Sequence, residues 1–279
     1  MMSKLEFQKH EARYYIGTVL LTTWLVTMLL FINPSVGIRS FTFLMFIPAI
    51  IAIIFMKITN SKPARFKKRL NMKSLLFGIL YPIFFIFLCA FISYITNVAT
   101  IHVQKGLDLK SIITIIVTLF VSLFAVWGEE YGWRGFLLPR LTEQYGKTKA
   151  TMIVGIVWAL YHVPAVYFLA KTTGIGNPLL LCTIQACVVF TLSFAFSYCY
   201  YLSGNLLPVL LFHSVWNLVN TTVLGDIYKN EQGIVQGNLL FINAEGILGL
   251  CLGVVFLFYF LKQFKKENVM LHTCEEGKK

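Results

Sequence analysis

The sequence has 279 residues, of which 57% are apolar and 13% are charged, whereas soluble domains carry about 25% charged residues. This shortage of charge and a mean hydropathy of +0.73 exclude a water-soluble globular fold of this size. The net charge of +12 suits either nucleic acid or a membrane surface. We favour membrane lipid and expect no nucleic-acid partner, because the cations fit the role of topology determinants against anionic lipid.

Long charge-free windows divide the chain into membrane-spanning helices. A helix needs about 20 apolar residues to cross the hydrocarbon core. The window 172–225 is long enough for two crossings, and Ser203-Gly204-Asn205 supplies turn residues that split it. We therefore expect an all-α, polytopic membrane protein that forms a single domain, residues 1–279. Its expected spans, about eight in number, are 14–32, 40–58, 74–98, 111–139, 150–170, 179–202, 206–224 and 238–261.

The distribution of lysine and arginine predicts which side of the membrane each end of the chain occupies. An even number of spans places both termini on one side. If the N-terminus is inside, 18 of the 24 cations lie in inner segments and five in outer segments, while Arg134 lies within a span. Because positive residues of short loops face the cytoplasm, we expect both termini to be cytoplasmic. The short loops favour a multi-pass protein of a bacterial cell membrane.

Three charged residues lie inside the span predicted over 111–139, in the stretch Trp127-Gly-Glu-Glu-Tyr-Gly-Trp-Arg-Gly135. Each ionised residue near the centre of such a helix costs about 2.5 to 3.5 kcal/mol, so the three need partners. Glu130 and Arg134 are four residues apart, and an ion pair that locks helices together accounts for both. Glu129 remains, about 100 degrees around the helix. Two adjacent carboxylates in a poorly solvated site are expected to push each other's pKa apart, which would let one of them act as a base.

The span predicted over 150–170 also carries polar groups. His162 lies one turn after Trp158 on the same helix face. Pro164 has no N–H to bond to the carbonyl of Leu160, so we expect that carbonyl to hold water.

The span predicted over 206–224 contributes His213 and Asn217, which are four residues apart and project to one place. We counted about 1.5 Å per residue from the cytoplasmic end of each span. The resulting depths are about 16 Å for Glu129, about 18 Å for His162, about 12 Å for His213 and about 18 Å for Asn217. Three helices thus place an acid, imidazoles and an amide at one level, and we interpret them as one shared site.

Hydrolysis of an amide needs a base that activates water, a proton donor for the leaving amine and donors for the oxyanion, and this set contains all three. Other intramembrane protease designs are excluded. The chain has no Gly-x-Ser-x-Gly motif, and its aspartates, Asp108 and Asp226, lie in predicted outer loops. His10-Glu11 is followed by Tyr14 where an HExxH motif requires histidine. Glutamate and histidine chemistry is what remains.

Three motifs resemble those of the CPBP (Abi) intramembrane proteases, a family that includes the CAAX prenyl proteases and bacteriocin self-immunity proteins. The family pattern is EExxxR, then an aromatic residue with xxxH, then HxxxN. The corresponding motifs here are Glu129-Glu130-Tyr-Gly-Trp-Arg134, Trp158-Ala-Leu-Tyr-His162 and His213-Ser-Val-Trp-Asn217. They occur in family order on separate predicted spans, and the resemblance covers a protease core of about 111–224.

The resemblance implies a role for each polar residue. Glu129 would activate the water with help from His162, Glu130 and Arg134 would organise the site, and His213 and Asn217 would stabilise the oxyanion. Many members carry phenylalanine at the position of Trp158, a variation that we expect to affect packing rather than chemistry.

The family is often labelled as metalloprotease, and two histidines with a glutamate are ligand types that suit zinc. If zinc binds, His162, His213 and Glu129 are the expected ligands and Glu130 becomes the base. The spacing does not decide between the alternatives. We favour glutamate-activated water without an obligatory metal.

The expected function is an intramembrane endopeptidase that cuts near the cytoplasmic face. Lipidated CAAX-type proteins, peptide precursors and membrane proteins all fit as substrates. The alternative is a non-proteolytic bacteriocin immunity or membrane scaffold protein. A transporter is disfavoured because we find no repeated half and expect no second polar level toward the outer face.

Overall fold

The computed structural model describes residues 4–61, 70–102 and 109–276, with side chains described over 10–61, 70–102 and 113–265. Asp108 and residues 62–69, which hold five of the cations assigned to inner segments, lie outside the described residues. The described chain is mostly helical, as the hydropathy pattern predicts. Its elements are α1 (Lys4–Leu30), α2 (Pro34–Ser40), the 3-10 helix η1 (Phe41–Phe46), α3 (Ile47–Thr59), α4 (Met72–Ile95), β1 (Ala99–Ile101), α5 (Leu109–Glu130), the π-helix η2 (Tyr131–Leu137), α6 (Leu138–Thr173), α7 (Pro178–Tyr201), α8 (Leu207–Val223), β2 (Val235–Gly237), α9 (Leu239–Ile242) and α10 (Ile247–Glu276).

Asparagine side chains begin several of these helices. The side chains of Asn33, Asn71 and Asn177 accept hydrogen bonds from N–H groups of the first turns of α2, α4 and α7. Two of these caps are followed by proline, which lacks an N–H and fits the first turn. The turn residues that interrupt the apolar windows therefore also fix where the next helix starts.

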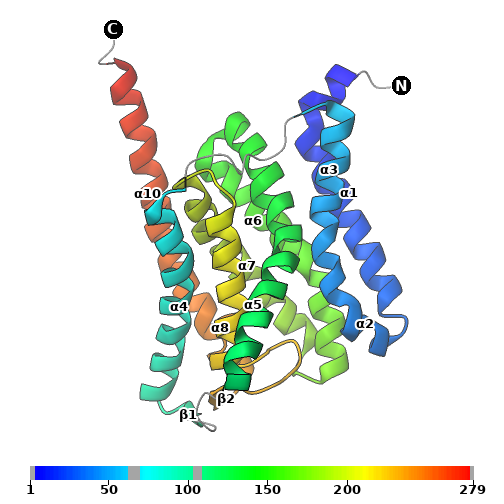
Figure 1. Ribbon diagram of the computed structural model, residues 1–279, viewed down its shortest axis with the longest axis vertical. Coiled ribbons are helices and arrows are strands. Elements are labelled where there is room, and N and C mark those ends of the chain that lie inside the picture. Colours follow the sequence, from blue (N-terminus) through cyan, green and yellow to red (C-terminus); the bar gives the residue numbers. More distant parts are fainter. Residues whose placement is uncertain (1–3, 62–69, 103–108, 277–279) are drawn as a thin grey trace.

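The helices run up and down between two ends of the molecule (Figure 1). The start of α1 and the end of α10 both lie at the upper end, so the described termini share one side. The continuous helical run from α5 through η2 into α6 turns back at Gly146, whose φ of 75° and ψ of 168° interrupt the helix. Gly146 therefore divides this run into an ascending and a descending leg.

Each predicted span overlaps a helix, although 238–261 is interrupted by the turn 243–246 between α9 and α10. The number of spans is not established by helix length. Six segments of the described chain are long and apolar enough to cross a membrane. The run Ile113–Thr173 counts as one segment although Gly146 folds it, and α8, with 17 residues, is one residue short of the length required. The molecule is a multi-pass membrane protein by this measure, and the count of eight and the cytoplasmic termini stay predictions.

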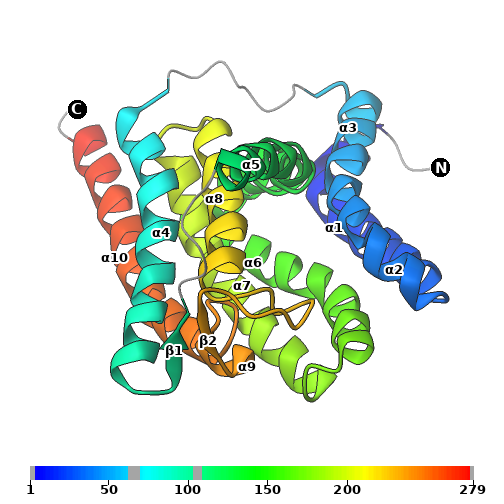
Figure 2. The same ribbon diagram turned by 60° about the horizontal axis from the view of Figure 1, so that its bottom comes forward.

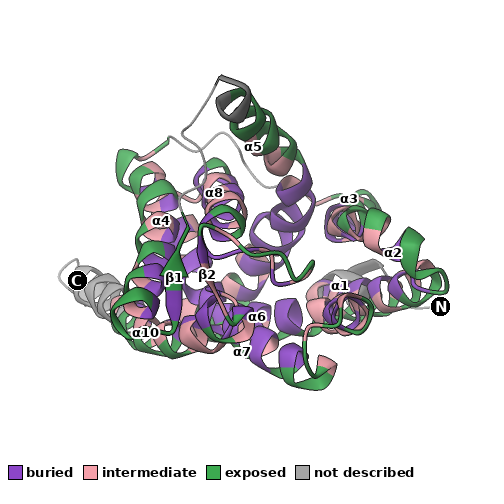
Figure 3. Ribbon diagram, turned by 90° about the horizontal axis from the view of Figure 1, so that it is seen from below, coloured by how far each residue is buried: buried purple, intermediate pink, exposed green. Residues whose placement is uncertain are grey.

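The helices surround a buried centre formed by α5, α6, α7 and α8. In Figure 2, α1, α2 and α3 lie on one side of this centre and α4 and α10 on the other. Buried residues gather where α6, α7 and α8 meet the C-terminal part of α5, whereas the N-terminal turns of α5 are exposed (Figure 3). Large apolar side chains such as Leu21, Phe84 and Phe120 are exposed on the outside, as expected for surfaces that face lipid.

Contacts between distant segments fasten the outer helices to this centre. Arg140 at the start of α6 donates to Glu11 of α1 through Nε at 2.7 Å and to Ser61, just after α3, through Nη2 at 2.7 Å. At the lower end, β1 pairs antiparallel with β2, with Ala99 opposite Gly237. The sequence did not predict these strands, because three residues are too few for an alternating pattern to be visible.

Candidate active site

The acidic pair of the first motif lies at the end of α5, where the helix changes to the π-helix η2. Two glycines allow this segment to approach its neighbours closely. A Cβ atom on Gly128 would lie 2.5 Å from the carbonyl oxygen of Met45, and one on Gly132 would lie 2.4 Å from Cβ of Pro48. Short π-helical segments are frequent at functional sites. The sequence predicted a regular helix here, so the π-helix is a finding of the structure.

Glu130 and Arg134 form the predicted ion pair, and both are fully buried. Arg134 Nη1 donates to both carboxylate oxygens of Glu130, at 3.1 and 3.0 Å. His213 of α8 joins them, with its Nδ1 2.9 Å from Glu130 Oε1. The guanidinium also lies over two aromatic rings, with Cζ 4.3 Å from the ring centroid of Trp158 and 4.7 Å from that of Phe196. This pair therefore connects α5 and η2 to α6, α7 and α8.

Glu129 points to a different set of partners. Its Oε2 accepts a hydrogen bond from Nε1 of Trp158 at 2.9 Å. Nδ1 of His162 lies 2.8 Å from the backbone carbonyl oxygen of the same tryptophan, so this nitrogen carries the proton and Nε2 is left for a ligand. Glu129 is 3% exposed, and its other oxygen, Oε1, accepts no hydrogen bond from the described part of the chain.

Glu129, His162, His213 and Asn217 line one cavity of about 420 Å³. They come from α5, α6 and α8, and the structure brings together the side chains that the depth estimate placed at one level. Glu130 and Arg134 do not line the cavity but lie behind it, where Glu130 holds His213. The volume lies in the usual range for ligand pockets. The set is thus arranged as an inner ion pair and an outer group that faces a ligand.

The donor set was also tested for a metal. No group of three or more His, Cys, Asp or Glu side chains within the described ranges is placed to hold a metal ion. His162, His213 and Glu129 are therefore not gathered into a set of three metal ligands in this structure. His213 instead uses Nδ1 to bind Glu130, and Glu129 binds Trp158.

One expectation about α6 is wrong. Trp158 was expected to affect only packing, yet its indole N–H donates to Glu129, a bond that phenylalanine cannot make. The carbonyl of Leu160, which Pro164 leaves without its helical partner, was expected to hold water. It accepts a hydrogen bond from Nε1 of Trp24 in α1 at 3.1 Å. Trp158 is buried, and the tendency of a buried indole N–H to find an acceptor is the signal that could have indicated its bond to Glu129.

The expectation of a single polar level is also wrong. Gln185, Tyr228 and Glu245 line the same cavity toward its lower end and are hydrogen-bonded to one another. A polar second level removes one of the two reasons given against a transporter. The signal was present in the sequence, because Glu245 falls inside the span predicted over 238–261.

Tyr228 lies in the loop between α8 and α9, outside the candidate membrane spans. Burial, followed by the neighbouring carboxylate of Glu245, raises the pKa of Tyr228 well above its ordinary value of 10. Its hydroxyl therefore stays protonated at neutral pH and serves as the donor to Glu245.

Comparison with known proteins bears on the same segment. Residues 111–219 match the family described as type II CAAX prenyl endopeptidase Rce1-like, and all six polar motif residues lie within that range. A stretch of 52 residues is 38% identical to CAAX prenyl protease 2 of Methanococcus maripaludis, and it spans 19% of this chain and 19% of that protein. Neither description mentions bacteriocin immunity. Residues 111–219 of this chain are thus similar to CAAX-type prenyl proteases, and they carry the three motifs noted in the sequence.

Proposed function

We propose that this protein is an intramembrane endopeptidase that hydrolyses a peptide bond with water activated by Glu129. The observation that supports the proposal most directly is the convergence of Glu129 and His162 on one cavity, each held by a hydrogen bond to Trp158. The similarity of residues 111–219 to CAAX prenyl endopeptidases supports the same reaction class.

Glu129 is the proposed base. One of its oxygens is held by the indole of Trp158, and the other accepts no hydrogen bond from the described residues. A water between this oxygen and Nε2 of His162 would lose a proton to the carboxylate while its lone pair attacks the carbonyl carbon of the substrate. A carbon–oxygen bond forms, and the carbonyl oxygen becomes an oxyanion.

His213 and Asn217 are the proposed donors to that oxyanion. Asn217 offers its amide N–H₂, which needs no titration. Nδ1 of His213 already binds Glu130, so an imidazolium at this position would direct its Nε2–H into the cavity. When the carbon–nitrogen bond breaks, the proton taken by Glu129 passes to the leaving amine, which leaves Glu129 ready for the next cycle.

The proposed substrate is a lipidated CAAX-type protein, a peptide precursor or a membrane protein, cut near the cytoplasmic face of a cell membrane. A cavity buried among spanning helices supports a substrate that is itself held in or on the membrane. The alternative of a non-proteolytic immunity or scaffold protein would use Glu130 and Arg134 to lock helices together and would need no water at Glu129.

The test is peptide cleavage by the purified full chain and two matched variants. Glu129→Gln keeps the shape but removes the base, and we expect a loss of at least about a hundredfold in kcat. Glu143→Gln makes the same change at an exposed position of α6 and is expected to keep full activity. Cleavage of lipidated and unlipidated peptides would be followed by mass spectrometry. Equal activity of the parent and Glu129→Gln would sink the proposal.

A further inference from the structure

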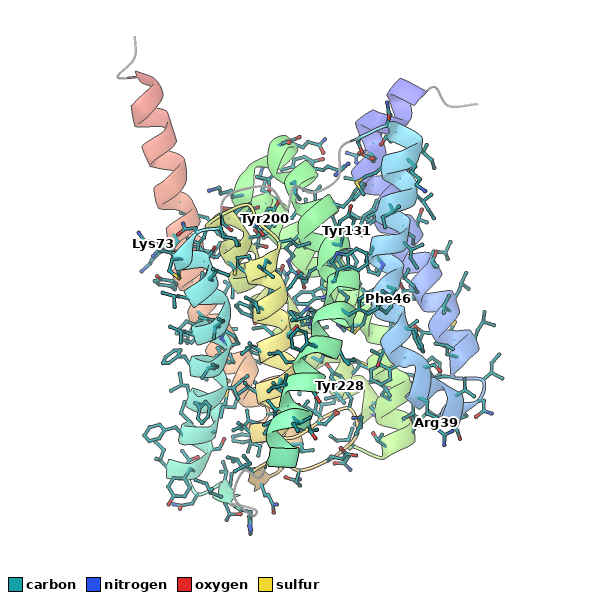
Figure 4. The ribbon with its side chains drawn as sticks, in the orientation of Figure 1. Arg39, Phe46, Lys73, Tyr131, Tyr200 and Tyr228 are labelled. Atoms are coloured by element: carbon teal, nitrogen blue, oxygen red, sulfur yellow. The ribbon has the colours of Figure 1, made fainter. Side chains whose placement is uncertain are left out.

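The lower end of the cavity forms a recess that the proposed reaction does not use. We define the lower recess by four residues: Gln185 of α7, Asn220 of α8, Tyr228 of the following loop and Glu245 of the turn before α10. All four line the same cavity as Glu129. Tyr228 is labelled in the lower part of Figure 4, whereas Tyr131, which directly follows the acidic pair, is labelled in the upper part.

The hydrogen bonds around Asn243 fix the orientation of Asn220. Asn243 donates through Nδ2 to the carbonyl of Gly225 at 2.8 Å, and its Oδ1 accepts the backbone N–H of Glu245 at 2.9 Å. Asn220 must therefore present Nδ2 to that Oδ1, which lies at 3.0 Å. Its own Oδ1 is left without a donor among the described residues, although Asn220 is only 4% exposed.

The orientation of the Gln185 amide is fixed in the same way by its hydrogen bonds. The hydroxyl of Tyr228 donates to Oε2 of Glu245 and so can only accept from Nε2 of Gln185, at 2.9 Å. Oε1 of Gln185 then has no donor in the described part of the chain, and the residue is 1% exposed. Trp216 donates to the other oxygen of Glu245 at 3.1 Å. The recess thus offers a carboxylate and two buried amide oxygens.

The charges along the cavity wall agree with this excess of acceptors. The acidic residues that line it are Glu129, Asp226 and Glu245, and the lysine that lines it, Lys229, lies 3.2 Å from Asp226. No described cation therefore faces Glu245. A buried acceptor without a donor costs about 1 to 3 kcal/mol, which a ligand that donates hydrogen bonds would recover.

The distance from the site to the recess can be counted along two helices. His213 and Asn220 are seven residues apart on α8, or about 10 Å along the axis. Phe196, which contacts His213, and Gln185 are eleven residues apart on α7, or about 16 Å. An extended peptide advances about 3.3 Å per residue, so this interval corresponds to about three to five residues.

We propose that the lower recess binds the ammonium or guanidinium group of a basic residue of the substrate, about three to five residues from the cleaved bond. The inference rests on the proposed function and narrows its substrate. Of the four residues of the lower recess, Asn220, Tyr228 and Glu245 lie outside the residues that match the Rce1-like family, and Gln185 lies inside them. A recess lined by acceptors disfavours a C-terminal carboxylate at that distance, such as the one that ends a CAAX box.

The first experiment measures binding, so that it does not depend on catalysis. The probe is a fluorescent apolar peptide with one lysine, compared with peptides that carry norleucine or glutamate instead, and the readout is anisotropy with the Glu129→Gln full chain. We expect the lysine peptide to bind at least about tenfold more tightly than the norleucine peptide, and the glutamate peptide to bind most weakly. Adding Glu245→Gln removes this preference, whereas adding Glu231→Gln, an exposed change in the loop that carries Tyr228, leaves it intact.

Further arms keep the result interpretable. If Glu245→Gln does not fold, Gln185→Leu removes one acceptor and is expected to reduce the lysine preference by at least about threefold. A second arm replaces sodium in the buffer by choline at equal ionic strength, which distinguishes a peptide site from a site for a free small cation. If sodium displaces the lysine peptide and choline does not, the proposal is contradicted. Equal binding of lysine and norleucine peptides also overturns it.

With the parent enzyme, product masses should place the cut three to five residues from the lysine. If the lysine peptide is bound but no peptide is cut, the proposed function fails and the proposed binding of a basic residue in the lower recess stands.

Discussion

At the scale of single residues, Trp158 connects the parts of the site. Its indole N–H donates to Glu129, its backbone carbonyl accepts from His162, and its ring covers the guanidinium of Arg134. The first two contacts orient the proposed base and its partner, and the third shields the buried ion pair. A phenylalanine at this position keeps the second and third contacts and loses only the first.

Trp158→Phe therefore isolates one hydrogen bond. We expect kcat to fall by about tenfold, with KM nearly unchanged, because a hydrogen bond to a charged group contributes about 1.5 kcal/mol or more. Initial rates over a range of peptide concentrations separate the two constants. Trp127→Phe is the matched control, since Trp127 packs against Phe124 and Tyr131 and does not line the cavity. A rise in KM at constant kcat would show that Trp158 binds substrate instead.

The polar site residues could be predicted one by one because a charge or imidazole inside an apolar span is costly. Their individual bonds could not. Whether the indole of Trp158 reaches Glu129 depends on how α5 and α6 are rotated against each other, and this rotation cannot be read from the sequence of either helix. Glu245 was missed for a different reason, since it directly precedes the charge-free run 246–261 and was not weighed as a charge inside its predicted span.

At the scale of elements, the change from α5 to the π-helix η2 places the motif against α1 and α3. Gly132 is the point of closest approach, because a Cβ there would lie 2.4 Å from both Pro48 Cβ and Tyr15 Oη. The hydroxyl of Tyr15 donates to the carbonyl of Pro48 at 3.0 Å, so these neighbours are held in place. The short contact therefore cannot be relieved by one side chain alone.

Gly132→Ala should push η2 away from α3. We expect a loss of about 1 to 3 kcal/mol of stability, seen as a lower thermal midpoint in detergent, together with reduced cleavage as the acidic pair shifts. Gly17→Ala is the control, because a Cβ at this exposed position of α1 meets nothing within 4 Å. That change should leave the midpoint unchanged or raise it by replacing glycine in a helix. An unchanged midpoint for Gly132→Ala would contradict the close packing.

Most helices could be predicted at this scale, since apolar windows and turn residues indicate them directly. The predicted boundary between the spans 111–139 and 150–170 agrees with the break at Gly146. The π-helix and the 3-10 helix could not be predicted, because they result from packing between segments distant in sequence and leave the apolar pattern unchanged.

At the scale of the whole molecule, one cavity is lined by α5, α6, α7 and α8, together with residues of α1, η1, the loop after α8 and the turn before α10. The proposed chemistry lies at one end and the proposed recognition of a basic residue at the other. The similar depth of the polar site residues in the membrane could be predicted from the helical rise per residue. Which helices are neighbours could not, because any order of spans satisfies the same hydropathy. The membrane orientation, with both termini inside, is still a prediction.

The central claim is that Glu129 and His162, carried by separate helices, act on one water. The measurement that tests it most directly compares kcat for the parent, Glu129→Gln, His162→Ala and the double variant on one peptide. Residues that work as a unit are not additive, so we expect the double variant to be within about threefold of the slower single variant. Losses that multiply in the double variant, or full activity in either single variant, would contradict the account.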